Sequence, residues 1–156
     1  MISLTIPGQG TLTLEHLLLD LNGTLTVDGV LLPGVPERIA LLRQRLSMRV
    51  LSADTRGDAS LVASALGLPL EVVAGPDEAS AKAEVARRLG AEHVAAIGNG
   101  VVDALLLSAA RLGIAVIGPE GAATVTLASA DVAVTRVIDA LDLLLREARL
   151  VATLRR

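Results

Sequence analysis

The chain has 156 residues and a formal net charge of −3, and 52% of it is hydrophobic although it contains no Phe, Tyr or Trp. The missing aromatic residues exclude a base-stacking platform for single-stranded nucleic acid. The acidic balance, with no basic run beyond the two terminal arginines, argues against any nucleic-acid partner. Without cysteine, disulfides, thiol catalysis and zinc–thiolate sites are excluded too.

No apolar run reaches 18 residues, and the first residues lack the pattern of a signal peptide. We therefore expect a cytoplasmic protein with no membrane partner. No linker, repeat or low-complexity segment interrupts the sequence, so we expect residues 1–156 to form a single domain.

Residues 2–14 contain two short alternating runs around Pro7–Gly10, which predict a β-hairpin. After it, short apolar runs alternate with segments of helical spacing. The expected strands are 16–20, 48–52, 70–75, 93–98, 114–118 and 131–135, and the expected helices are 36–46, 57–67, 78–90, 101–113, 121–128 and 137–154. This order predicts an α/β fold of three layers, with a Rossmann-like parallel sheet covered by helices on both faces.

Polar residues stand where these strands end. The first expected strand ends at Asp20, the second at Ser52, and the fourth at Gly98–Asn99 with Asp103 four residues later. Lys82, the single lysine of a chain rich in arginine, lies near the start of the helix that follows the third strand. Ligands of such sheets bind outside the carboxyl ends of the strands, so we expect these side chains to share one site.

The side chains form a chemically coherent set. A carboxylate can act as a nucleophile toward phosphorus, while a hydroxyl and an ammonium can hold phosphate oxygens. Two carboxylates with carbonyl oxygens are ligands that suit Mg²⁺. The pattern therefore indicates phosphoryl chemistry assisted by a hard cation.

Four segments, in order, carry a resemblance to a known family: DLNGTLT (20–26), VLSAD (50–54), Lys82 and GNGVVD (98–103). The chain resembles the haloacid dehalogenase (HAD) superfamily of phosphatases and phosphotransferases. Its first motif is most similar to that of the P-type ATPases, which reads DKTGTLT. Because the chain has no membrane segment, it resembles most the small soluble proteins that are like P-type ATPases. The resemblance spans residues 16–118, and the alternation of strands and helices extends it to nearly the whole chain.

The resemblance implies a role for each matching residue. Asp20 would be the nucleophile that forms an aspartyl-phosphate. The Mg²⁺ ion would be held by Asp20, the backbone carbonyl of Asn22, Asn99 and Asp103. The phosphoryl group would be held by Ser52, Ala53, Lys82, Asn22 and Gly23, and residues 26–31 would form a small β-flap over the site.

Two departures from the family pattern concern activity. HAD phosphatases usually carry a second Asp where this chain has Asn22, and an amide cannot exchange a proton near neutral pH. The fourth motif usually begins Gly-Asp, but here it begins Gly98-Asn99, which removes one negative charge from the metal site. We therefore expect low or narrow activity and weaker Mg²⁺ binding.

No segment is long enough to be a cap domain, either after the flap or between residues 75 and 79. Capless members of the superfamily act on large phosphorylated substrates or form homo-oligomers. The first hypothesis is thus a Mg²⁺-dependent phosphohydrolase that works through Asp20. The second is a catalytically silent module that binds phosphate or a partner, and the third is a capless, tetrameric sugar-phosphate phosphatase.

Ordinary structural explanations stand beside these hypotheses. Asp20 would be a turn residue, Ser52 or Asp54 a helix cap, Lys82 a surface lysine, Asn99 a turn residue, and Asp103 the partner of a surface arginine. Arg56 and Asp58 are expected in a solvated loop. A helix cap at Ser52 or Asp54 would still allow phosphate binding, because helix N-termini favour anions.

Overall fold

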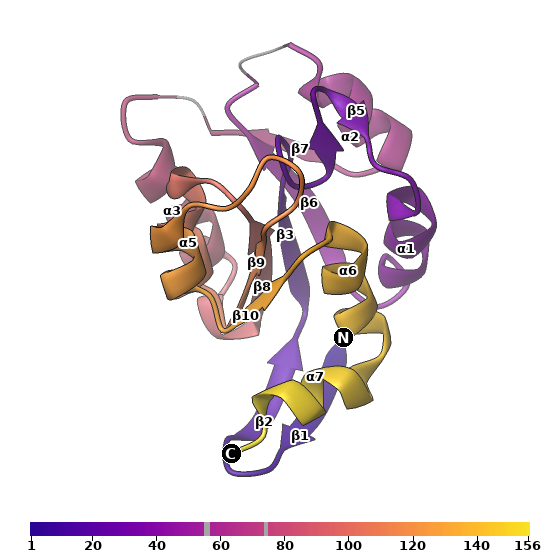
Figure 1. The fold of residues 1–156 in the computed structure, drawn as a ribbon, viewed down its shortest axis with the longest axis vertical. Helices are drawn as coiled ribbons and strands as arrows, with labels where there is room; N and C mark the ends of the chain where they lie inside the picture. The colour runs from indigo at the N-terminus through magenta and orange to yellow at the C-terminus, as the bar shows by residue number, and fades with distance from the viewer. Residues whose placement is uncertain (55–56, 74) are drawn as a thin grey trace.

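The computed structural model describes residues 1–54, 57–73 and 75–156. Arg56 of the expected loop and Ala74 of the third expected strand lie outside the described residues. Figure 1 shows the fold. The strands are β1 (Ile2–Ile6), β2 (Gly10–Leu14), β3 (His16–Asp20), β4 (Thr26–Val27), β5 (Val30–Leu31), β6 (Ser47–Ser52), β7 (Leu70–Val72), β8 (Val94–Gly98), β9 (Leu112–Val116) and β10 (Val132–Val134). The α-helices are α1 (Val35–Leu42), α2 (Ala59–Leu66), α3 (Glu78–Arg88), α4 (Ala104–Ala109), α5 (Thr124–Ser129), α6 (Val137–Leu145) and α7 (Glu147–Leu154), and two 3₁₀ turns are η1 (Ala91–His93) and η2 (Val101–Asp103).

Six of the strands form one parallel sheet in the order β10-β9-β8-β3-β6-β7. The chain adds β6 and β7 on one side of β3 and then crosses to add β8 and β9 on the other side. The loops after β3 and β8 therefore leave the sheet at its topological switch point, which is where open α/β sheets bind ligands. The three-layer α/β fold expected from the sequence is confirmed.

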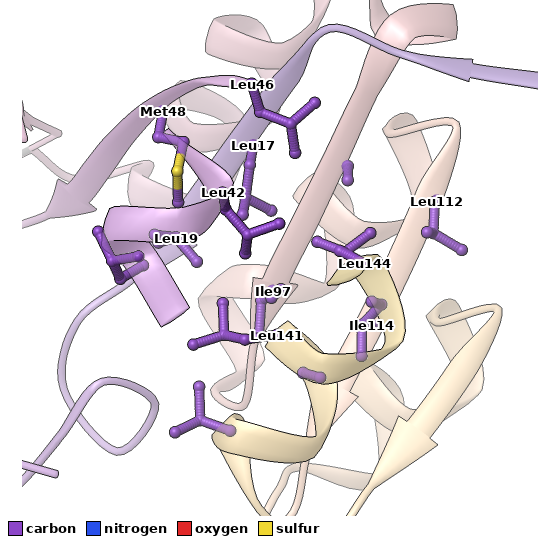
Figure 2. Close-up of a cluster of buried hydrophobic side chains, with 14 of the residues drawn as sticks. Leu17, Leu19, Leu42, Leu46, Met48, Ile97, Leu112, Ile114, Leu141 and Leu144 are labelled. Carbon is purple, nitrogen blue, oxygen red and sulfur yellow. The ribbon is translucent and has the colours of Figure 1, made fainter. Parts of the chain in front are cut away.

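The two faces of the sheet bury alternate residues of the same strands. Leu17 and Leu19 of β3 lie in the cluster covered by α1, α2 and α6, whereas Leu18 lies in the smaller cluster covered by α3 and α4. Figure 2 shows the first cluster, in which Leu42 of α1 and Leu141 of α6 pack over Leu19 and Ile97. A strand with both faces buried must be apolar throughout, and this explains the uninterrupted leucines of β3.

The N-terminal hairpin projects from the amino end of the sheet and is covered by α7 (Figure 1). Its strands pair antiparallel, and alternate residues face inward, so that Ile2, Leu4 and Ile6 of β1 are buried. The N–H of Arg156 donates to the carbonyl of Pro7 at 3.1 Å, which ties the last residue of the chain to the hairpin turn.

The terminal helix differs from its prediction. The sequence predicts one helix over 137–154, but the chain breaks at Arg146, whose φ of −119° and ψ of 71° are not helical. Up to Leu145 the chain covers the sheet, and after Arg146 it turns so that Leu150 is buried with the hairpin residues. No glycine or proline marks this break, and beyond it α7 packs against the apolar hairpin.

Gly113 was predicted to end a helix and instead lies inside β9. Helix α4 already ends at Ala109, and the chain enters β9 at Leu112. A Cβ atom at position 113 would lie 2.5 Å from the carbonyl oxygen of Leu107, so the glycine lets helix α4 approach the strand closely.

Candidate active site

The predicted site residues come together at the switch point. A cavity of about 130 Å³ opens between the carboxyl ends of β3, β6 and β8 and the first turns of α3. It is lined by Asp20, Asn22, Ser52, Ala53, Glu78, Lys82, Asn99, Gly100, Val102 and Asp103. Of the residues predicted for the site, only Gly23 is absent from this lining, and it lies at the wall of an adjacent apolar cavity of about 210 Å³.

Lys82 is the centre of the site. Its side chain is only 1% exposed, and Nζ donates to Oδ1 of Asp20 at 2.7 Å and to Oδ1 of Asp103 at 2.8 Å. Asp77, the N-cap of α3, accepts a hydrogen bond from the N–H of Ser80 at 3.1 Å and fixes the start of that helix. The explanations of Lys82 as a surface residue and of Asp103 as the partner of a surface arginine are therefore wrong.

Burial and neighbouring charges shift the pKa values of Asp20 and Lys82. Burial, and then the neighbouring charge of Asp103, raise the pKa of Asp20 to about 7, against the opposing effect of Lys82. Burial lowers the pKa of Lys82, but the carboxylates of Asp20 and Asp103 raise it by more, so Lys82 is protonated. The site thus holds an acid poised near neutral pH beside a permanent cation, an arrangement typical of functional sites.

The loop after β8 is built around Asp103. Its Oδ2 accepts from the backbone N–H of Asn99 at 3.0 Å and from that of Gly100 at 2.9 Å. A Cβ atom at Gly98 would lie 2.6 Å from Cγ of Asp103, so only glycine allows this carboxylate to fold back against the strand end. These contacts hold the other oxygen, Oδ1, toward Lys82.

The loop after β3 is closed by backbone hydrogen bonds to Leu21. Its carbonyl accepts from the N–H of Leu25 at 2.9 Å and from that of Thr26 at 3.0 Å. Gly23 has a φ of +78°, and a Cβ atom there would lie 2.5 Å from Nδ2 of Asn99, which explains the glycine. The loop keeps Asn22 beside Asp20 at the cavity.

Asn99 and Asn22, the two departures from the family pattern, differ in their contacts. Oδ1 of Asn99 accepts from the hydroxyl of Thr24 at 3.2 Å, and its Nδ2 donates to the carbonyl of Gly121 at 3.1 Å. Asn99 therefore braces three loops around the site. Oδ1 of Asn22 is buried and has no hydrogen-bond partner in the described part of the chain.

Ser52 lies at the end of β6 and is almost fully buried. Its Oγ accepts from the N–H of Asp54 at 3.0 Å, and Oδ1 of Asp54 accepts from the N–H of Ala59 at the start of α2. The N-cap position of α2 is Asp58, which was expected in a solvated loop, so neither Ser52 nor Asp54 is the N-cap, although Asp54 accepts from the first N–H of the helix. The hydroxyl of Ser52 stays at the cavity wall.

The flap forms as predicted. Strands β4 and β5 pair antiparallel, and the turn between them uses Asp28 and Gly29 with φ values of 51° and 80°. The N–H of Asp28 donates to Oε1 of Glu120 at 3.3 Å, which connects the flap to the loop after β9. Among the described residues, only this small hairpin separates β3 from α1.

Sequence reasoning missed Glu78, the first residue of α3. Its Oε1 lies 3.5 Å from Nζ of Lys82, and its side chain lines the cavity. The available signal was its position four residues before the single lysine, where the two side chains share a helix face.

The described part of the chain contains no group of three or more His, Cys, Asp or Glu side chains arranged to hold a metal. A cation in the cavity would therefore depend on two carboxylates completed by other oxygens. Over the same residues, no helix has both the length and the apolar character needed to cross a bilayer.

One curated relative matches 50% of the chain. No family model matches the sequence. The protein MJ0073 of Methanocaldococcus jannaschii, itself uncharacterized, is 50% identical over 82 residues, which are 50% of this chain and 88% of MJ0073.

Solved structures share the fold. A protein of Streptomyces avermitilis MA-4680 assigned to the HAD family of hydrolases has a TM-score of 0.63 and 24% identity, over 78% of this chain and 76% of its own. The 3-deoxy-D-manno-octulosonate 8-phosphate phosphatase of Moraxella catarrhalis, in complex with magnesium ion, phosphate ion and KDO, has a TM-score of 0.66 and 21% identity over 91% and 94% of the two chains.

A zinc-transporting PIB-type ATPase is also similar, with a TM-score of 0.65 and 27% identity over 79% of this chain but only 20% of the ATPase. This likeness agrees with the P-type ATPase wording of the first motif. The chain belongs to the same family as MJ0073, and its fold is that of the HAD superfamily.

Proposed function

We propose that the protein is a phosphohydrolase that transfers a phosphoryl group to Asp20 and then to water. The observation that carries this proposal is the buried contact of Lys82 with both Asp20 and Asp103, at the ends of β3 and β8. If this cluster served stability alone, apolar side chains would be expected in its place, because buried charges cost free energy. A cluster kept in an open cavity is better explained by chemistry.

The residues divide the work as follows. Oδ of Asp20 attacks phosphorus, and the bond between phosphorus and the leaving-group oxygen breaks. Lys82 binds the phosphoryl oxygens, and the hydroxyl of Ser52 donates to them. Water then attacks the phosphorus, the bond to Asp20 breaks, and phosphate leaves.

The donor set fits a Mg²⁺ ion. The carboxylates of Asp20 and Asp103 and the backbone carbonyl of Asn22 are the oxygens that would hold it, and Mg²⁺ sites commonly use one or two carboxylates with water and phosphate oxygens. The raised pKa of Asp20 supports the same assignment, since a cation would offset the repulsion between the two acids. Bound there, the ion would neutralise charge on the phosphoryl group.

Asn99 takes a different part in this proposal from the one its sequence position implies. Its Oδ1 accepts from Thr24 and its Nδ2 donates to Gly121, so both ends of the amide are engaged within the protein. We assign it to bracing the loops rather than to direct ligation. The metal site then has two negative charges instead of three, and binding is weak.

The second candidate is a silent module that binds phosphate or a partner. The unpartnered Oδ1 of Asn22 and the bracing role of Asn99 favour it, because neither amide can move a proton. The retained contacts of Asp20, Lys82 and Asp103 oppose it. In both cases the described residues contain no cap, and a large phosphorylated substrate has access to the site.

Trapping the phosphoenzyme separates the two candidates. The protein is mixed with p-nitrophenyl phosphate and Mg²⁺, quenched in acid, and mapped by peptide mass spectrometry. We expect one phosphoryl group on Asp20, none in Asp20→Asn, and the wild-type amount in Asp28→Asn, an exposed acid of the flap. Absence of label from wild type, with phosphate still bound, would support the silent module.

A further inference from the structure

The proposed reaction lacks an acid–base group at its usual place. A leaving alkoxide needs a proton, and the water that attacks the aspartyl-phosphate must lose one. Asn22 can do neither. The question is therefore which other side chain of the cavity can carry the proton.

The titratable side chains that line the cavity are Asp20, Glu78, Lys82 and Asp103. Asp20 is the proposed nucleophile. Lys82 is held as an ammonium by two carboxylates, and its side chain is almost fully buried. Asp103 is also enclosed, and its oxygens accept from Lys82 and from two backbone N–H groups. Among the described residues of this lining, Glu78 alone has a carboxylate that accepts no hydrogen bond; its contact with Lys82 is a longer ion pair of 3.5 Å.

Glu78 is placed to reach both the reacting group and solvent. Its Oε1 lies 3.5 Å from the nitrogen that also bonds Asp20, so both carboxylates lie beside the ammonium to which the proposed function assigns phosphate binding. Its side chain is 23% exposed, against 1% for those of Lys82 and Asp103. Within the described residues no hydrogen bond fixes its carboxylate, and a glutamate at the first position of α3 can rotate over the cavity.

We propose that Glu78 is the general acid and general base of this reaction, replacing the missing carboxylate at position 22. The inference rests on the proposed function. In the first step the carboxylic acid of Glu78 protonates the leaving oxygen as its bond to phosphorus breaks. In the second step the resulting carboxylate takes a proton from water as the water oxygen bonds phosphorus and Asp20 departs. Each cycle returns Glu78 to the acid and converts a phosphate monoester and water to an alcohol and phosphate.

The ordinary explanation of Glu78 is a helix-surface ion pair with Lys82, worth a few tenths of a kcal/mol. Two observations oppose it. Lys82 is not on the surface, and it already has two shorter carboxylate partners. A stabilising pair predicts that loss of Glu78 affects unfolding, whereas the proposal predicts that it affects rates of proton transfer.

The test compares Glu78→Gln with Glu84→Gln on the same helix, where Glu84 is exposed and pairs with Arg87. Formation and decay of the phosphoenzyme are measured by quenched flow with p-nitrophenyl phosphate, whose leaving group needs no proton, and with ethyl phosphate, whose leaving group does. For Glu78→Gln we expect formation from p-nitrophenyl phosphate at nearly the wild-type rate. Decay, and formation from ethyl phosphate, should slow by roughly 10²–10⁴-fold. Glu84→Gln should match wild type throughout.

A second background sharpens the test. In Asn22→Asp, a carboxylate stands again beside Asp20, so adding Glu78→Gln should slow decay by less than about tenfold. An equal loss in both backgrounds would indicate that Glu78 only shapes the site, and it would overturn the proposal.

The failures are distinguishable. If the phosphoenzyme forms on Asp20 and decays equally fast in Glu78→Gln and wild type, the proposal for Glu78 is overturned while the proposed function stands. If no variant forms a phosphoenzyme, including Asn22→Asp, both are overturned together.

Discussion

At the carboxyl ends of β3 and β8 the protein buries Asp20, Lys82 and Asp103 against one another, whereas at the amino end of the sheet the hairpin and α7 bury hydrocarbon. Figure 1 shows these two regions at opposite ends of the molecule. The hairpin and α7 contribute Ile2, Leu4, Ile6, Leu12, Leu14 and Leu150 to the core. Such burial stabilises by roughly 1.5–3 kcal/mol per large side chain.

The buried polar side chains of the described residues are confined to one of these regions. They are Asp20, Thr24, Thr26, Ser52, Lys82, Asn99, Asp103 and Thr126, and each belongs to the site or hydrogen-bonds to a loop beside it. Thr126, for example, donates to the carbonyl of Gly100 at 2.6 Å. Among the described residues, the costly buried polar side chains therefore gather at the end of the sheet where the proposed site lies.

The largest expected effect is on the region where Asp20, Lys82 and Asp103 are buried together, the charged end of the molecule. Lys82→Met should destabilise the protein by roughly 3–5 kcal/mol, because it leaves two buried carboxylates without their cation. Urea unfolding at pH 7 measures the loss, and Arg87→Met on the exposed face of α3 is the matched control. Adding Asp20→Asn should recover part of the loss. A loss below about 1 kcal/mol would contradict the central role of Lys82.

Truncating a buried side chain at the apolar end, formed by the hairpin and α7, should lower the free energy of unfolding by nearly as much. Leu150→Ala is expected to lower the free energy of unfolding by roughly 2–5 kcal/mol, since Leu150 is fully buried. The exposed neighbour Thr153→Ala should change it by less than about 0.5 kcal/mol. The loss in Leu150→Ala should be the same at pH 5 and pH 8. A negligible loss would show that α7 does not hold the hairpin in solution.

A smaller effect is that the stability contributed by the charged end depends on pH, whereas the stability contributed by the apolar end does not. Because the folded protein raises the pKa of Asp20 from 3.8 to about 7, the folded state binds the extra proton between these values, and this group's contribution to stability falls as pH rises from 4 to 7. Asp20→Asn removes that fall. In chelator-treated samples the stability of the variant relative to wild type should therefore increase from pH 4 to pH 7 and stay constant above.

The shift should be readable in thermal unfolding. Between pH 4 and pH 8 the melting temperature of Asp20→Asn should rise relative to that of wild type by at least about 2–4 °C, the shift that 1 kcal/mol produces in a chain of this size. A difference that does not vary with pH would contradict the raised pKa of Asp20.

The smallest expected effect is that of Mg²⁺. At ten times its dissociation constant, the ion should stabilise the protein by about 1.4 kcal/mol, because it binds the native state alone. Differential scanning fluorimetry across a millimolar titration measures it. The shift should vanish in Asp103→Asn and persist in Asp28→Asn. If wild type shows none, the proposed metal site is wrong and the silent module is favoured.

The sequence predicted the charged end better than the apolar end. Asp20, Ser52, Asn99 and Asp103 follow apolar strands, and parallel strands bring their carboxyl ends to one edge, so periodicity alone predicted their meeting. Lys82 was harder, because helix spacing does not reveal burial, but its uniqueness in an arginine-rich chain gave the signal.

What the sequence could not predict depends on contacts between distant segments. The break at Arg146 places α7 on the hairpin, and Gly113 lies in a strand that α4 approaches closely. Glu78 was missed because a glutamate in the first turn of a helix is common on surfaces. The contacts of Asn99 with Thr24 and Gly121 likewise join three separate loops.

The most direct test of the central claim is Mg²⁺-dependent hydrolysis of p-nitrophenyl phosphate by wild type, Asp20→Asn and Asn22→Asp, measured side by side. We expect slow hydrolysis by wild type, none by Asp20→Asn, and a rate at least about tenfold above wild type for Asn22→Asp, in which a carboxylate beside the nucleophile supplies a faster proton route. Retained activity in Asp20→Asn, or no activity in any of the three, would contradict a phosphohydrolase that works through Asp20.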